Sequence, residues 1–286
     1  MSDTNSSDFV QSFYWESLPL RGARCRVDGV FQRVLRDVQL PHSVRQLLGE
    51  IMVGLALLSS TQKHFERLIL QAQSGGNLQL LVAEFLTGGG MRAYARWRGD
   101  DESVDLATLP EALLALTVDM GLDRDRYQGL IQLRQTLTQS LEAYFLESVQ
   151  APAYFRLMVD AEQGIAGGYF LQRLPGVLTT EEWNTATGFL AVGSDRSLLL
   201  AQPEQFLPEI FPNVGVRLRA PEPLQFQCSC SRERVERMLI ALGETEVEET
   251  LATEGSIQVT CEYCQTVYRL DASEVAALFA AGKALH

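Results

Sequence analysis

Apolar residues recur along the chain at two spacings, and each spacing belongs to a different region. Between residues 41 and 63 the apolar positions repeat at helical intervals, which predicts one long helix that Pro41 can begin. From residue 67 to residue 174, short runs that alternate apolar and polar residues predict strands. The expected strands are 67–73, 78–86, 91–97, 113–120, 127–133, 154–161 and 167–174, with "SGGN" as a hairpin turn between the first two, and residues 136–150 are expected to form a helix.

The pattern changes after residue 176. Thr179 is followed three residues later by Glu182, a capping-box start, and residues 178–212 read as helical pieces broken by glycines and prolines. The proline-rich stretch 219–226 is typical of an extended linker. Beyond it, the pattern predicts a helix at 232–242, an acidic helix, a hairpin with "CEYC" at its bend and a last helix through Ala281.

These elements together predict an α+β protein with three parts. Residues 1–176 are expected to form an N-terminal core domain that mixes helices with antiparallel strands. Residues 177–225 are expected to form a helical linker, and residues 226–286 a small C-terminal domain.

The net charge of the chain argues against two classes of binding partner. The 286 residues carry a formal net charge of −12, which argues against a broad nucleic-acid surface and against attraction to an anionic membrane. The polar, acidic start "MSDTNSSDFV" lacks the features of a signal peptide, and the apolar run from Ile51 is too short to cross a bilayer. We therefore expect a cytoplasmic protein with neither a membrane nor a nucleic-acid partner.

Four of the five cysteines lie close together near the end of the chain. Cys228 and Cys230 form a Cys-x-Cys pair, and after thirty residues Cys261 and Cys264 form a Cys-x-x-Cys pair. Two such pairs can supply four thiolates to one tetrahedral ion, a donor set that suits Zn²⁺. Because all four positions would be protein sulfur, no position remains for a catalytic water. The spacing predicts one zinc ion per chain with a structural role.

Spacing alone leaves several interpretations of these cysteines open. They can be unpaired core residues, an inert structural zinc module or a nucleic-acid-binding zinc ribbon. From residue 226 to residue 286, ten acidic residues outnumber five basic ones, which disfavours the ribbon. A redox switch also has a physical basis: a module of about 60 residues has a small core, so metal binding can supply much of its folding free energy, and thiolates are the species that oxidants attack.

The stretch from residue 177 to residue 216 is rich in large apolar residues for a connector. It can be an ordinary folded helical segment, or it can bind unfolded chains once the module that supports it melts. The candidate client-binding residues are Trp183, Phe189, Leu190, Leu199, Phe206, Ile210 and Phe211.

No motif indicates an enzyme. The sequence has no GxSxG elbow, no Walker A loop and no GxGxxG after a strand, and its three histidines are scattered. Cys25 stands alone between two arginines, and a half-buried strand position is its commonest explanation.

The chain resembles the redox-regulated bacterial heat-shock chaperone family of thirty-three kilodaltons over nearly its whole length. The matching motifs are "CSCSRERVERML", "CEYC" and "YRLDASEV" in the C-terminal part, and "LPLRGARCRVD", "VRQLLGE", "RYQGLIQL" and "GGYFLQRLPG" in the N-terminal part.

The resemblance implies an ATP-independent holdase that keeps thermally unfolding and oxidatively damaged proteins from aggregating. It implies an inactive reduced form with zinc on the four cysteines. Oxidation would join Cys228 with Cys230 and Cys261 with Cys264, release zinc, unfold the C-terminal module and linker, and favour a homodimer. The alternative is a constitutive zinc-stabilised adaptor that binds one folded partner.

Two of the chain's departures from the family pattern concern the cysteines. Gln265 follows Cys264 where knuckles of this kind usually favour glycine, so we expect strain in that turn and a shifted zinc affinity. Cys25 lies outside the ligand set and is free to form a mixed disulfide.

Overall fold

The computed structural model describes residues 8–62, 64–99, 104–121, 126–192 and 194–283, with side chains through residue 280. The contacts divide the chain into two compact units, Met1–Gln227 and Cys228–His286, and each unit is described by itself. Helices and antiparallel strands alternate along the chain, which confirms the expected α+β class.

The first sheet of the larger unit is antiparallel and runs in the order β10-β1-β2-β9-β8, with the short strand β11 also paired to β1. Its strands are β1 (Phe9–Trp15), β2 (Leu20–Arg26), β8 (Ala153–Asp160), β9 (Ile165–Arg173), β10 (Val216–Leu218) and β11 (Glu222–Pro223). Strands β1 and β2 pair with each other, in a register that runs from Phe9 opposite Arg26 to Tyr14 opposite Arg21.

The second sheet runs in the order β12-β5-β4-β3-β6-β7. Its strands are β3 (Arg67–Gln73), β4 (Leu78–Leu86), β5 (Gly90–Trp97), β6 (Leu113–Asp119), β7 (Tyr127–Gln132) and β12 (Gln225–Phe226). The expected hairpin of residues 67–86 is confirmed. The stretch 219–226 is extended as expected, and it adds β11 to one sheet and β12 to the other.

Helix α2 (His42–Ser59) forms the centre of the core, because it contacts strands of both sheets. Thirteen of its residues are buried, so its apolar character extends around most of its surface. The helix ends at Ser59 rather than Lys63, which lies outside the described residues. The hydroxyls of Ser59, Ser60 and Thr61 donate to carbonyls of the last turn, an interaction that competes with further helix.

Two other helices complete this core. Helix α1 (Asp28–Leu35) packs near β9 and β5, and helix α3 (Leu137–Tyr144) packs against β7 and β8. The single helix expected over 136–150 is α3 followed by a wider π-helical turn over Phe145–Val149.

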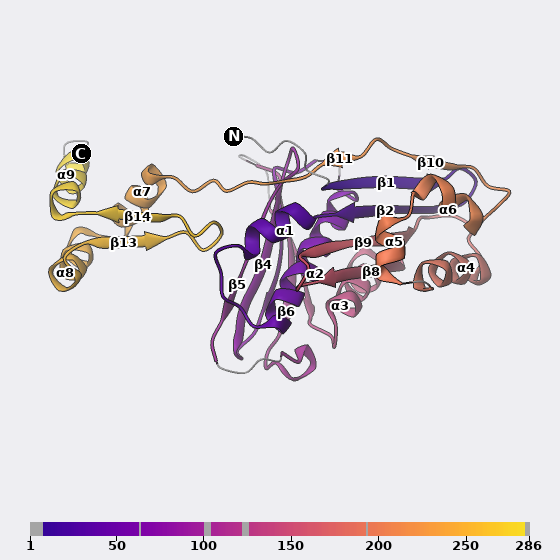
Figure 1. The fold of residues 1–286 in the computed structure, drawn as a ribbon, viewed down its shortest axis with the longest axis horizontal. Coiled ribbons are helices and arrows are strands. Elements are labelled where there is room, and N and C mark those ends of the chain that lie inside the picture. Colours follow the sequence, from indigo (N-terminus) through magenta and orange to yellow (C-terminus); the bar gives the residue numbers. More distant parts are fainter. Residues whose placement is uncertain (1–7, 63, 100–103, 122–125, 193, 284–286) are drawn as a thin grey trace. The chain divides into compact units, whose positions relative to one another are not determined.

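Three short helices lie over the first sheet of the larger unit (Figure 1). They are α4 (Thr180–Ala191), α5 (Asp195–Leu200) and α6 (Pro203–Ile210). The predicted capping box is present, since the Thr179 side chain accepts from the Glu182 amide and the Glu182 carboxylate accepts from the Thr179 amide. Residues 178–210 share a second apolar core with β1, β2, β8 and β9.

The smaller unit consists of α7 (Arg232–Leu242), α8 (Glu244–Glu254), β13 (Ile257–Thr260), β14 (Val267–Leu270) and α9 (Ala272–Lys283). The predicted helices and hairpin are all present, although α9 continues past Gly282 instead of ending at Ala281. Its apolar core contains seven buried residues, Val235, Leu239, Val247, Ile257, Leu270, Val275 and Phe279.

Among the helices of the described residues, none is both long enough and apolar enough to cross a membrane.

Candidate metal centre

The two cysteine pairs lie on loops that the neighbouring elements fix. Cys228 and Cys230 precede α7, whose first turn is capped by the Ser231 hydroxyl accepting from a main-chain amide. Cys261 and Cys264 lie in the tight connection between β13 and β14. In that connection the Cys261 amide donates to the carbonyl of Thr266 at 2.9 Å. The hairpin register therefore sets the position of one pair, and the start of α7 sets the other.

The four thiols converge on one point. Their sulfur atoms all lie within 4.8 Å of one another. The Cys228 and Cys261 sulfurs are 3.7 Å apart, and the Cys230 and Cys264 sulfurs are 3.3 Å apart. A tetrahedron of Zn–S bonds near 2.3 Å places sulfurs about 3.8 Å apart, so this donor set fits a zinc-sized ion. All four cysteines are free thiols in the structure.

Hydrogen bonds and burial give the thiols unequal acidities. Burial raises the pKa of Cys230 to about 12, and the Tyr268 hydroxyl, which donates to its sulfur at 3.1 Å, only partly offsets this. Burial also raises the pKa of Cys261. Burial opposes the thiolate of Cys264, but hydrogen bonds with the Thr266 hydroxyl and amide and with neighbouring thiols lower its pKa to about 6. One thiol of the group is thus easily ionised.

Two residues of this centre were not singled out by the sequence, Thr266 and Tyr268. Thr266 contacts the Cys264 sulfur at 3.2 Å, and the hydrogen bond to Cys230 raises the pKa of Tyr268 to about 12. Their positions in the sequence, just after the second cysteine pair, could have indicated them, because a hairpin places such residues beside the sulfurs.

The turn after Cys264 contains the departure from the usual glycine. Gln265 has a φ of 59°, in the left-handed region where a Cβ is unfavourable. Its amide donates to the Cys261 carbonyl at 2.8 Å, and its side chain donates to the Glu262 carbonyl at 2.9 Å. The backbone therefore adopts the glycine-type conformation with a glutamine in place.

The solvent exposure of the four thiols decides whether an oxidant can reach them. Cys228, Cys230 and Cys261 are partly exposed, and Cys264 is buried. Four convergent thiols can hold a metal ion, and partly exposed thiols can also react with an oxidant.

Cys25 is separate from this group and lies in the larger unit. Its side chain is 3% exposed on β2, and its thiol contacts the carbonyl of Val53 at 3.8 Å. Burial raises the pKa of Cys25 far above its usual value, which disfavours the reactive thiolate.

The residues predicted to bind clients lie in or directly after the three short helices, and their side chains pack in or against the second apolar core. Leu190 and Ile210 are buried in the second apolar core. The others are partly buried against it, namely Trp183, Phe189, Leu199, Phe206 and Phe211. In this form of the molecule these side chains pack on the first sheet and do not present an open surface.

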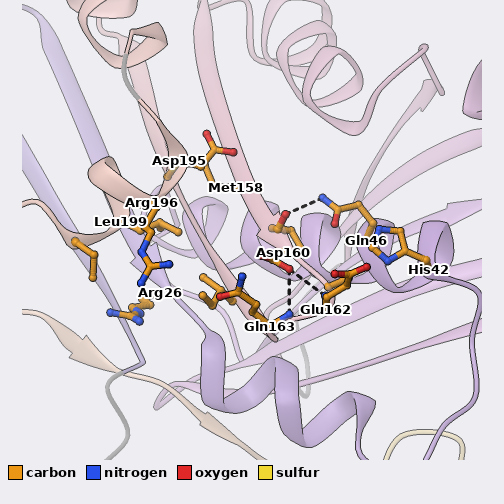
Figure 2. Close-up of a pocket in the computed structure, with 14 residues that line it drawn as sticks. Arg26, His42, Gln46, Met158, Asp160, Glu162, Gln163, Asp195, Arg196 and Leu199 are labelled. Carbon is orange, nitrogen blue, oxygen red and sulfur yellow. Dashed lines mark hydrogen bonds between the residues drawn. The ribbon is translucent and has the colours of Figure 1, made fainter.

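A cavity of about 560 Å³ lies where α5 meets the turn between β8 and β9 and the start of α2. Figure 2 shows Arg26 and Arg196 on one side of it, and His42 and Glu162 on the other. Met158 and Leu199 belong to its apolar lining. The lining contains no nucleophile held by a general base, so the cavity does not indicate catalysis.

Comparison with known proteins gives a consistent family match. The model of the family described as "Hsp33 protein" matches residues 8–271. The 33 kDa chaperonin of Azotobacter vinelandii is 35% identical over 286 residues, covering 96% of this chain and 95% of that protein. The 33 kDa chaperonin of Nitrosococcus oceani is 34% identical, with the same shares covered.

The fold is also similar to a solved structure. The crystal structure of the 33 kDa chaperonin from Thermotoga maritima aligns with a TM-score of 0.79 at 22% sequence identity. The alignment covers 95% of this chain and 98% of that one. At this identity the likeness concerns the fold.

Proposed function

The chain belongs to the Hsp33 family, and from that premise we propose that it is a redox-switched holdase, inactive when reduced and zinc-bound. Family membership confirms that it is a chaperone rather than an enzyme. The observation that carries the switch is the convergence of Cys228, Cys230, Cys261 and Cys264 to within 4.8 Å at partly exposed positions. In this proposal the four thiolates hold one zinc ion, which ties the two loops of a small module together.

The proposed switch acts through the thiols. Cys228 forms a disulfide with Cys230, and Cys261 forms one with Cys264. When two thiolates form one S–S bond, they release two electrons and are no longer available as metal ligands. The electrons reduce an oxidant such as hypochlorite to chloride, or hydrogen peroxide to water. With all four ligands consumed, the zinc site is lost and the module loses the main support for its fold.

The small apolar core of the module supports this step. A core of seven buried residues is small for a module of about 60 residues, so in this proposal metal binding supplies much of its folding free energy. The proposed domain roles follow: residues 1–176 form the stable core, residues 177–225 a metastable linker, and residues 226–286 the redox switch. Loss of the switch would release the linker and its apolar side chains for unfolded clients. The activated chain would act as a homodimer in the cytoplasm.

The test combines two readouts on one sample. Zinc-loaded, reduced protein is treated with hypochlorite, zinc release is followed with a chromophoric chelator, and aggregation of a heat-unfolding client is followed by light scattering. The proposal expects zinc release together with suppressed aggregation, both reversed by thiol reductant and zinc. Zinc that stays bound, or that leaves without any gain in holding activity, would favour the zinc-stabilised adaptor instead.

A further inference from the structure

The helices that cover the first sheet are attached to it through their main chain. Arg156 on β8 donates from Nη1 to the carbonyl of Leu190 in the last turn of α4. Tyr169 on β9 donates its hydroxyl to the carbonyl of Leu198 in α5, at 3.1 Å. Both acceptors lie toward the carboxyl ends of their helices, and the Leu198 carbonyl also accepts from the Ala201 amide at 3.3 Å.

Two neighbouring strands make the same kind of contact. Arg24 on β2 donates from Nη1 to the carbonyl of Ala201, at 3.3 Å. Gln11 on β1 donates from Nε2 to the carbonyl of Arg219, at 2.9 Å. The Arg24 Nε also donates to the Gln11 side-chain oxygen at 2.8 Å, so the two donors hold each other in place.

The four donors form one continuous row across the sheet. Arg156 is the register partner of Tyr169, Tyr169 is the partner of Arg24, and Arg24 is the partner of Gln11. Partners in register project on the same face, so four strands present four side-chain donors in a line. We name this row the donor strip. Each member contacts a carbonyl of the segment 177–225, and a carbonyl is present at every residue of any polypeptide.

The donor strip crosses an apolar field. The sheet residues of the second apolar core on this face are Phe13, Trp15, Leu20, Met158 and Leu171, together with Tyr169 of the strip itself. The covering helices approach this face closely, since a Cβ at Gly167 would lie 2.5 Å from a methyl carbon of Leu199. Apolar contacts on both sides of a row of donors suit an extended chain, whose side chains and carbonyls alternate in direction.

The strip is shielded from water in this form of the molecule. Tyr169 is 2% exposed, Gln11 is 5% exposed, and the Arg156 side chain is 16% exposed. Donors in such positions need acceptors, because an unmade buried hydrogen bond is costly. When the covering segment leaves, the strip must be rehydrated or must find other carbonyls.

We propose that the donor strip is a main-chain binding site for unfolded polypeptide, occupied in the resting state by the chain's own residues 177–225. The inference rests on the proposed function, because a client reaches the strip only after that segment has been released. The strip then donates to client carbonyls as it donates to Leu190, Leu198, Ala201 and Arg219 in the resting state. Recognition through carbonyls does not depend on client sequence, and the apolar field selects exposed hydrophobic stretches.

The proposal predicts opposite effects of one variant in the two redox states. The double variant Arg156→Met, Tyr169→Phe removes two donors while keeping much of the apolar volume. In the reduced, zinc-loaded state it should suppress client aggregation without oxidant, and amides of residues 180–210 should exchange at least tenfold faster. In the oxidised state it should bind a labelled, carboxymethylated and permanently unfolded α-lactalbumin about tenfold more weakly than the unmodified oxidised protein.

A matched double variant serves as the control. Tyr154→Phe removes a hydroxyl from the same face of β8, and Arg134→Met removes an exposed arginine paired with Glu147 at 2.9 Å. Among the described residues, neither side chain donates a hydrogen bond to a carbonyl of the segment 177–225, so both states should behave as in the unmodified protein. The single variant Tyr169→Phe, which removes only one hydroxyl, covers the case in which the double variant does not fold.

Two outcomes would overturn the inference. If the oxidised variant binds the unfolded probe as tightly as the unmodified protein, the strip only attaches the segment and does not bind clients. If the reduced variant keeps the segment fully protected, the strip does not hold it either. A failure of the proposed function looks different, because the unmodified oxidised protein would then not bind the probe at all.

Discussion

The C-terminal module and the three helices over the first sheet are both small, but they are held in different ways. The module has seven buried apolar residues and four convergent thiols. The helices share an apolar core with the sheet, which contributes Phe13, Trp15, Leu20, Met158, Tyr169 and Leu171, and their carbonyls are held by the donor strip. An oxidant can attack the four thiols of the module directly. The sheet residues that hold the helices, as named above, include no thiol.

In the proposed function, the module senses the oxidant and the sheet with its helices holds the client. The thiol centre would convert oxidation into loss of a small fold, because metal binding would supply much of the folding free energy there. An interface built from apolar contacts and main-chain hydrogen bonds responds only to changes in stability. The following predictions alter one region at a time, from the largest expected effect to the smallest.

Cys264→Ser should have the largest effect, because it removes a metal-ligand candidate whose pKa is lowered to about 6. We expect zinc affinity to fall more than about 100-fold, since even outer contacts of a metal site contribute 10- to 100-fold. The module should lose its helical circular dichroism, and the protein should hold clients without oxidant. Cys25→Ala is the matched control and should keep full zinc content. A folded, inactive Cys264→Ser protein would contradict the dependence of the module on its metal.

Leu207→Ala tests the support of the helices without touching the thiols. Leu207 is fully buried in the second apolar core, so the cavity should cost about 2–5 kcal/mol of stability in that region. Hydrogen exchange of residues 180–210 should accelerate while zinc stays bound. Leu200→Ala, at a position 58% exposed, should change little. Equal exchange in the two variants would show that the apolar core does not hold the helices.

Thr179→Ala removes the capping box of α4 and should destabilise that helix by about 1 kcal/mol. The hydrogen bonds from the Thr179 amide and hydroxyl hold the pKa of Glu182 below its usual value. The stabilisation is therefore present above the ordinary pKa of a glutamate and is lost as the pH falls through the lower folded value. Amide hydrogen exchange at the start of α4 measures this stabilisation when it is followed across this pH range in Thr179→Ala and in the control Thr180→Ala.

Gln265→Gly should have the smallest effect and the opposite sign. A glycine removes the left-handed strain at a φ of 59°, which stabilises the metal-bound hairpin by up to about 1 kcal/mol. Competition with a chromophoric chelator should show zinc affinity raised by up to about fivefold. Gln265→Ala retains the Cβ and should show no gain. An equal gain in the alanine variant would assign the effect to the lost side chain of Gln265 rather than to the backbone.

The sequence predicted those features that depend on local pattern. The hairpin of residues 67–86, the capping box at Thr179 and the gathering of the four cysteines all follow from short-range spacing or donor chemistry. The end of α2 was placed too late, because three hydroxyls in succession divert the last carbonyls.

The donor strip could not be predicted from local sequence patterns. Arg24 and Ala201 are 177 positions apart, and Gln11 and Arg219 are 208 apart. Their contacts depend on the strand order and register of the first sheet, which no local pattern specifies. Carbonyl acceptors also carry no residue identity, so the sequence of the segment 177–225 contains no mark of these contacts.

The central claim is that loss of the thiol centre releases the helices over the first sheet. The direct measurement is hydrogen exchange read by mass spectrometry on one sample during oxidation, with zinc release and holding activity followed in parallel. The account predicts that residues 180–210 lose protection as zinc leaves and activity appears, while β3, β4 and β6 stay protected. Activity that appears with residues 180–210 still fully protected would contradict it.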